Sequence, residues 1–159
     1  MFGKKTAWLW ILGMILTTWA CDSNHMYDDS LSVPETGWHK DNLIQFKVEV
    51  PDTTSPYNFF LNLRNNTDYN YSNAFFFLKT TYPSGQLARD TIQIIVADHR
   101  GKWLGKGFGR IKDQQIQLRK EMTFPQQGLY IFEIQHGMRT DTLFGIEDVG
   151  IRIEKAISE

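Results

Sequence analysis

Short segments in which apolar and polar residues alternate recur along most of this 159-residue chain. In residues 44–50 every second residue is apolar, and the segment ends at Pro51. Because successive side chains of a strand point to opposite faces of a sheet, this alternation is typical of a strand with one buried face. Comparable segments follow at 59–64, 75–78, 92–96, 116–118, 130–134 and 149–154. Turn sequences rich in Gly, Pro and Asp separate them.

This pattern predicts an all-β fold with about eight strands. Residues 75–78 are apolar on both faces, which indicates a central strand. No window shows helical periodicity over more than two turns. We therefore expect an antiparallel β-sandwich with a jelly-roll-like arrangement, in which each sheet buries one face.

The first 20 residues have the features of a secretion signal. Lys4 and Lys5 precede an apolar run that ends at Leu16, and the small residue Ala20 stands directly before Cys21. The run of about 10 apolar residues is too short to span a bilayer, which takes about 20. A lone Cys at this position is typical of a bacterial lipoprotein whose thiol is acylated, with simple secretion as the alternative. We expect acylated Cys21 to hold the protein on a membrane of the cell envelope.

These features divide the chain into four parts. We expect a signal peptide at 1–20, a lipidated N-terminus and tether at 21–37, the β-sandwich domain at 38–155 and a tail at 156–159. Residues 22–37 are polar and lack apolar periodicity. Fully extended, such a tether would reach about 50 Å.

The composition excludes several classes of function. The net charge is −1 and no continuous run of Lys and Arg occurs, so nucleic acid is a poor partner. Cys21 is the only cysteine, so neither a disulfide framework nor a cysteine metal site is available. None of the four histidines has metal-ligand spacing, and we expect His99 in a turn and His136 at an exposed strand end. We therefore expect no metal and no cofactor.

No catalytic constellation can be assembled from the sequence either. Ser84 and Gly85 read as a turn, not as part of a nucleophile elbow. Glu147 and Asp148 are the only late pair of carboxylates, and adjacent strand residues point to opposite faces. The sequence therefore indicates a protein that is not an enzyme.

Residues 98–109 combine a turn with a glycine-rich stretch. Asp98 and Gly101 bracket two polar residues, which predicts a hairpin turn with glycine at positive φ. We expect the chain to return as a strand with Gly105, Gly107 and Gly109 on one face. Glycines in such a strand mark a bulge or a close approach of another backbone or a ligand.

A few large side chains are candidates for contacts with partners. Arg64 and Arg139 suit charged anchors at a protein interface, where Arg is enriched, and a structural ion pair is the alternative for Arg64. Trp38 and Trp103 either complete the core or form an exposed platform for a sugar or a protein.

Several segments in order along the chain resemble one family. The most specific is VADHRGKWLGKG at 96–107, and the others are 63–65, 68–73, 124–130, 138–139 and 145–153. Together they resemble the gliding-motility lipoprotein GldH family of Bacteroidota over essentially the whole chain after the signal. The resemblance implies an envelope lipoprotein associated with gliding motility and the linked type IX protein secretion system. It implies no enzymatic activity.

On this resemblance we expect the protein to act through contacts with other envelope proteins of the gliding or secretion apparatus. The expected contact surface comprises Trp38, Arg64, Asp98, Trp103, Gly105, Gly107, Arg139 and Asp148. The alternative is a carbohydrate-binding jelly-roll lipoprotein, which requires an exposed aromatic platform for a glycan.

Overall fold

The structure, a computed structural model, describes residues 25–157, and all regular elements in this range are strands. No helix in this part of the chain is long and apolar enough to cross a membrane. The strands are β1 (His25–Ser32), β2 (Trp38–His39), β3 (Ile44–Val50), β4 (Tyr57–Asn66), β5 (Asn73–Thr81), β6 (Leu87–Ile95), β7 (Ile111–Met122), β8 (Gly128–His136), β9 (Thr142–Leu143) and β10 (Ile146–Lys155).

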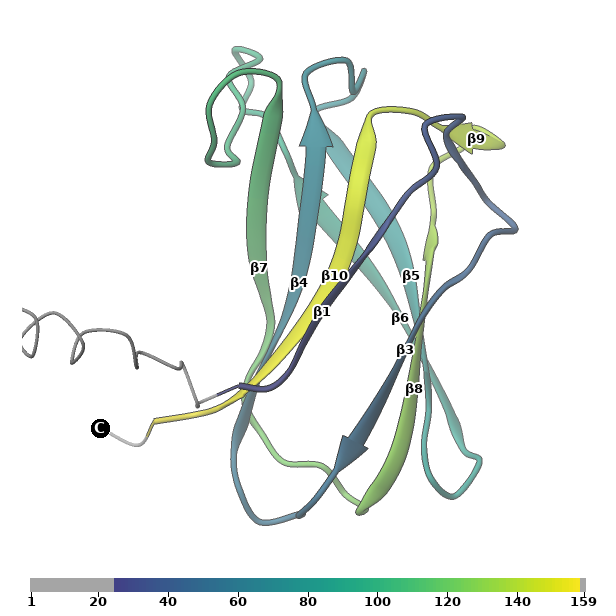
Figure 1. The fold of residues 1–159 in the computed structure, drawn as a ribbon, viewed down its shortest axis with the longest axis vertical. Helices are drawn as coiled ribbons and strands as arrows, with labels where there is room; N and C mark the ends of the chain where they lie inside the picture. Colours follow the sequence, from purple (N-terminus) through teal and green to yellow (C-terminus); the bar gives the residue numbers. More distant parts are fainter. Residues whose placement is uncertain (1–24, 158–159) are drawn as a thin grey trace, which may run out of the picture.

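Two four-stranded antiparallel sheets pack face to face (Figure 1). Sheet I has the order β1-β10-β4-β7 and sheet II the order β3-β8-β5-β6, while the short strands β2 and β9 pair with each other. Apart from the β5–β6 hairpin, each long strand is followed along the chain by a long strand of the other sheet. This interleaving of eight strands is the arrangement of a jelly roll. The predicted fold class is confirmed.

The predicted alternation defines the inner faces of both sheets. In β3, Phe46, Val48 and Val50 are buried while the residues between them are exposed. In β4, Tyr57 and every second residue after it are likewise buried. Each such side chain contributes about 1.5–3 kcal/mol when it leaves water. Strand β5 lies between β8 and β6, as expected for a central strand.

The segment that we expected to be a tether was predicted wrongly from His25 onward. Residues 25–32 form β1, an edge strand paired with β10, and Val33 continues the contact by donating its amide to the Glu147 carbonyl at 2.7 Å. An edge strand exposes most of its side chains, so its sequence lacks the alternation that marks the central strands. The described domain therefore begins four residues after Cys21, which itself lies outside the described residues.

The returning strand that we expected at 103–109 is also absent as a regular element. The connection between β6 and β7, residues 96–110, is a loop whose strand-like pairing is limited to two isolated bridges, Ala97 to Trp103 and Lys106 to Asp113. Gly107 at φ 131° and Gly109 at φ 66° cannot continue an extended strand. We call this segment the β6–β7 loop.

The two ends of the sandwich differ in what they carry. At the end that we call proximal, β1 begins and β10 ends, and His25 pairs with Glu154 there. At the other, distal end β4 ends and β7 begins, and the β6–β7 loop extends from it (Figure 1).

Candidate functional site

A polar groove of about 800 Å³ crosses the outer face of sheet I toward its distal end. All four strands of the sheet and the β6–β7 loop contribute to it. Its polar lining includes Ser30, Asn62, Arg64, Lys106, Asp113 and Asp148. The sheet thus brings together two residues that the sequence singled out, Arg64 from β4 and Asp148 from β10.

Arg64 holds the floor of the groove together. Its Nε donates to Asp113 Oδ1 at 2.6 Å and its Nη1 donates to Asp148 Oδ2 at 2.9 Å. Asp148 also accepts a hydrogen bond from Ser32 Oγ at 2.6 Å, so the network joins all four strands of sheet I. The hydrogen bond to Asp113 raises the pKa of Arg64, which keeps the guanidinium charged. Arg64 is therefore in the structural ion pair that the sequence offered as its alternative role.

Gly105 and Gly107 let the β6–β7 loop fold back onto the start of β7. The amide of Lys106 donates to the Asp113 carbonyl at 2.8 Å, and the Asp113 amide donates back to Lys106 at 2.7 Å. A Cβ at Gly105 would lie 3.1 Å from the Asp113 carbonyl oxygen, and one at Gly107 would lie 2.6 Å from the carbonyl oxygen of Ile111. The close approach that these glycines permit is to backbone of the same chain.

Asp98 and Trp103 fix the base of this loop. Asp98 Oδ1 accepts the amides of Arg100 at 2.8 Å and Lys102 at 2.9 Å, and Gly101 has φ 78°, as the turn sequence predicted. Trp103 is half-buried and packs against the core. Both residues position the loop and contribute little side-chain surface to the groove itself.

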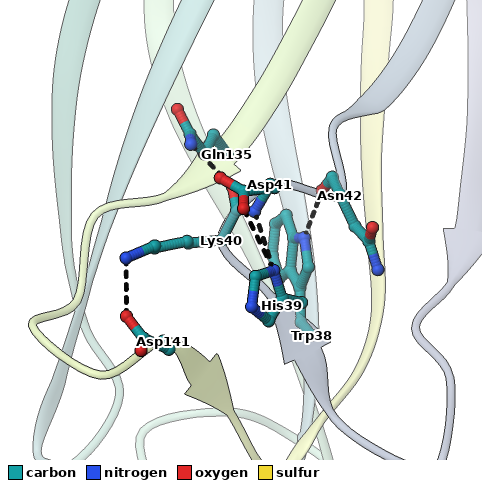
Figure 2. Close-up of polar contacts among 7 residues, drawn as sticks. All are labelled: Trp38, His39, Lys40, Asp41, Asn42, Gln135 and Asp141. Atoms are coloured by element: carbon teal, nitrogen blue, oxygen red, sulfur yellow. Dashed lines mark hydrogen bonds and ion pairs between the residues drawn. The ribbon is translucent and has the colours of Figure 1, made fainter.

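Trp38 cannot belong to a contact surface, which corrects that expectation. Its side chain is 1 % exposed, stacks on Phe76 at a ring-centre distance of 5.8 Å and meets His136 edge-on at 5.6 Å. Its Nε1 donates to the Asn42 carbonyl at 2.6 Å (Figure 2). Trp38 is therefore a core residue, and it cannot be a sugar-stacking platform.

A polar cluster over Trp38 ties the β2 turn to the loop after β8. Lys40 Nζ donates to Asp141 Oδ1 at 2.6 Å, and Gln135 Nε2 donates to the Lys40 carbonyl at 2.6 Å (Figure 2). The hydrogen bond from Lys40 lowers the pKa of Asp141 and raises that of Lys40. Arg139, in the same loop, is exposed and does not line the groove.

His136 lies at the end of β8, but the expectation that it is exposed was wrong. The side chain is 2 % exposed because it packs behind Trp38. Within the described residues neither ring nitrogen has a hydrogen-bond partner. Burial lowers the pKa of His136, and the nearby cation Lys40 acts in the same direction. Backbone groups of Asp141 and Trp38 oppose the shift but do not offset burial.

This buried imidazole makes the stability of the domain depend on pH. Below the unfolded pKa of about 6.5 the unfolded chain binds a proton at His136 that the folded chain resists. We therefore expect the free energy of unfolding to decrease as the pH is lowered from 7.5 to 5. His136→Leu should flatten this dependence in urea titrations across that range, whereas His99→Gln, at an exposed turn, should leave it intact. Equal slopes for wild type and His136→Leu would contradict the assignment.

Two features of the site were not predicted. Phe108, at the tip of the β6–β7 loop, is fully exposed, and Leu104 beside the groove is 49 % exposed. The sequence signal was present, because Gly107 and Gly109 flank Phe108, but glycines alone do not say whether the residue between them points inward or outward.

The groove has the chemistry of a binding surface. Its two acidic side chains, Asp113 and Asp148, are both engaged by Arg64, and neither His nor Cys lines it. Among residues 25–157 no group of three or more His, Cys, Asp or Glu side chains is placed to hold a metal ion. What remains available to a partner is hydrogen-bonding amides, the cation of Lys106 and the apolar side chain of Leu104.

Comparisons with solved structures give only weak likenesses. An arabinose-bound α-L-arabinofuranosidase matches 79 % of this chain and 19 % of its own, with 13 % identity and a TM-score of 0.38. The infectious bursal disease virus VP2 subviral particle matches 81 % of this chain and 30 % of its own, with 12 % identity and a TM-score of 0.34. At such scores neither likeness carries weight for fold or function.

Sequence comparison is far more specific. A gliding motility lipoprotein GldH homolog of Christiangramia forsetii is 37 % identical over 158 residues, covering 95 % of this chain and 96 % of the relative. The gliding motility lipoprotein GldH of Flavobacterium johnsoniae is 34 % identical, covering 95 % and 97 %. The family model for the GldH lipoprotein matches residues 25–153, nearly the whole described domain. On this evidence the chain belongs to the GldH lipoprotein family.

Proposed function

We propose that this chain is a lipid-anchored envelope protein that serves gliding motility, type IX protein secretion or both by binding other envelope proteins. The observation that carries the proposal is the distal groove, whose lining lies toward the end of sheet I opposite the start of β1. The names of the two relatives support the link to gliding motility.

The short link between Cys21 and the domain determines where the groove lies relative to the membrane. His25 lies four residues after Cys21, so the link between them spans at most about 14 Å. Strand β7 alone, with 12 residues, is about 40 Å long. If Cys21 carries the lipid, the proximal end stands close to the membrane and the groove lies toward the end farther from it, where partner proteins can reach it.

Protein contact is favoured over glycan binding by the state of the two tryptophans. The carbohydrate alternative requires an exposed aromatic platform with polar neighbours. Trp38 is buried, and Trp103, on the β6–β7 loop, is half-buried against the core. The groove instead presents an Arg–Asp network and a cation on its rim, which is typical of the polar parts of protein interfaces.

Crosslinked capture from native membranes tests this proposal. We expect the wild-type protein to enrich a defined set of envelope proteins, and Cys21→Ala to lose both membrane association and that set. Arg64→Ala should lower capture about tenfold, while Arg89→Ala, an exposed arginine of β6 in the other sheet, should not. If the lipidated protein captures nothing that Cys21→Ala misses, the proposal fails. If polysaccharide alone is captured, the carbohydrate alternative replaces it.

A further inference from the structure

Positive charge is concentrated at the distal end beside the groove. Residues 99–112 hold five of the 17 Lys and Arg residues and no Asp or Glu, although the whole chain has a net charge of −1. Arg110 pairs with Asp68, and Lys112 Nζ donates to the Gly107 carbonyl at 2.9 Å. The other three cations of this segment, which make no ion pair within the described residues, are Arg100, Lys102 and Lys106.

An apolar side chain projects from the middle of this basic segment. Phe108 is fully exposed, between Gly107 at φ 131° and Gly109 at φ 66°. Glycine adopts such positive φ angles readily, and the phenyl ring between the two glycines faces solvent. A large aromatic side chain held in water next to cations is typical of an interface anchor, because such residues dominate binding energy once they are covered.

The loop that carries these groups is held in place before any partner arrives. The paired hydrogen bonds between Lys106 and Asp113 fasten it to β7, and the Asp98 turn fastens its base. Lys112 holds the backbone of Gly107, directly before Phe108. A fixed loop loses little conformational entropy on binding, so its contacts translate efficiently into affinity.

We propose that the β6–β7 loop and the groove beside it bind an acidic polypeptide segment that also carries apolar side chains. This proposal rests on the function proposed above and adds the chemistry of the partner. The unpaired cations would meet carboxylates, Phe108 and Leu104 would be covered by apolar groups, and the amides of the groove would satisfy the backbone of the bound segment.

The geometry favours a polypeptide over an anionic lipid surface. The loop borders a groove of about 800 Å³ that is lined by hydrogen-bonding side chains, and a flat bilayer cannot enter such a hollow. The loop also lies at the distal end, about one β7 length, or 40 Å, from the end where β1 begins (Figure 1). A membrane that anchors the chain near His25 therefore lies at the opposite end of the sandwich.

Binding to defined polymers tests the partner chemistry directly. The probes are poly-L-glutamate, a random copolymer of glutamate and tyrosine, and vesicles of phosphatidylglycerol, each with the full protein. We expect the copolymer to bind more tightly than poly-L-glutamate, and both affinities to fall as salt rises. Phe108→Ala should remove the advantage of the copolymer. The triple variant R100E/K102E/K106E should weaken both polymers about tenfold or more.

A matched control separates local chemistry from net charge. The triple variant K47E/R89E/K120E makes the same change in charge at exposed positions outside the loop and should retain polymer binding. Thermal unfolding should be similar for both triple variants, because all six side chains are exposed. Equal losses in the two triple variants, or vesicle binding stronger than copolymer binding, would overturn the inference.

The outcome can be told apart from failure of the proposed function. If the wild-type protein captures envelope proteins and R100E/K102E/K106E captures the same set, the partner chemistry is wrong while the proposed function stands. If the wild-type protein captures no envelope protein, the proposed function fails.

Discussion

Replacing Trp38 with alanine should destabilise the domain by about 3–5 kcal/mol, the cost of removing a large aromatic side chain from a core. The indole is 1 % exposed and packs against both Phe76 and His136. Its loss would leave a cavity between the sheets. It would also leave the Asn42 carbonyl without the Nε1 donor at 2.6 Å (Figure 2).

Urea unfolding followed by circular dichroism measures this effect. Trp38→Phe fills most of the cavity but cannot donate to Asn42, so we expect a loss of about 1–3 kcal/mol, mostly the cost of the unpaired carbonyl. Trp103→Ala is the matched control, because this tryptophan is only half-buried and should cost less than Trp38→Ala. Similar losses at the two positions would contradict the deeper burial of Trp38 as the source of its larger contribution to stability.

Alternation of apolar and polar residues was sufficient to predict the strands that have one solvent-exposed face and one buried face. In β3 the buried Phe46 and the exposed Lys47 differ so clearly that the strand and its orientation follow from the sequence. The strand β1 could not be found this way, because what holds it is its pairing with β10. Arg152 reaches Asp28 at 2.8 Å across this pair, a contact 124 residues apart in sequence.

The candidate site was predictable only in part, for a similar reason. Arg64 could be named as an ion-pair residue from its type, but its partners Asp113 and Asp148 come from strands that only the folded sheet makes neighbours. Trp38 and Trp103 look alike in sequence, but Trp38 packs between Phe76 and His136 in the core, whereas Trp103, on the β6–β7 loop, is only half-buried. The exposure of Phe108 likewise depends on how the folded loop places it between Gly107 and Gly109, which the sequence does not specify.

The close packing of β1 against β10 depends on a glycine, Gly150, which has no side chain. Gly150 of β10 lies opposite Ser30 of β1 and Asn62 of β4. A Cβ at position 150 would lie 2.0 Å from Ser30 Oγ and 2.6 Å from the carbonyl oxygen of Asp29. The serine side chain could rotate away, but the carbonyl is backbone, so any side chain at 150 must displace the strand.

Gly150→Val should therefore detach β1 and destabilise the domain by about 3 kcal/mol, the upper part of the range for overpacking a well-filled site. Native-state hydrogen exchange should show loss of protection across residues 25–32 while β4 and β7 stay protected. Ser30→Ala is the control, because it removes the contacting oxygen without adding volume and should keep β1 in place. If Cys21 carries the lipid as proposed, detachment would also add the eight residues of β1 to the membrane link, and proximal-end crosslinks to lipid should weaken. Unchanged protection at 25–32 in Gly150→Val would show that β10 shifts to admit the side chain, and would contradict the close fit as the reason for glycine at this position.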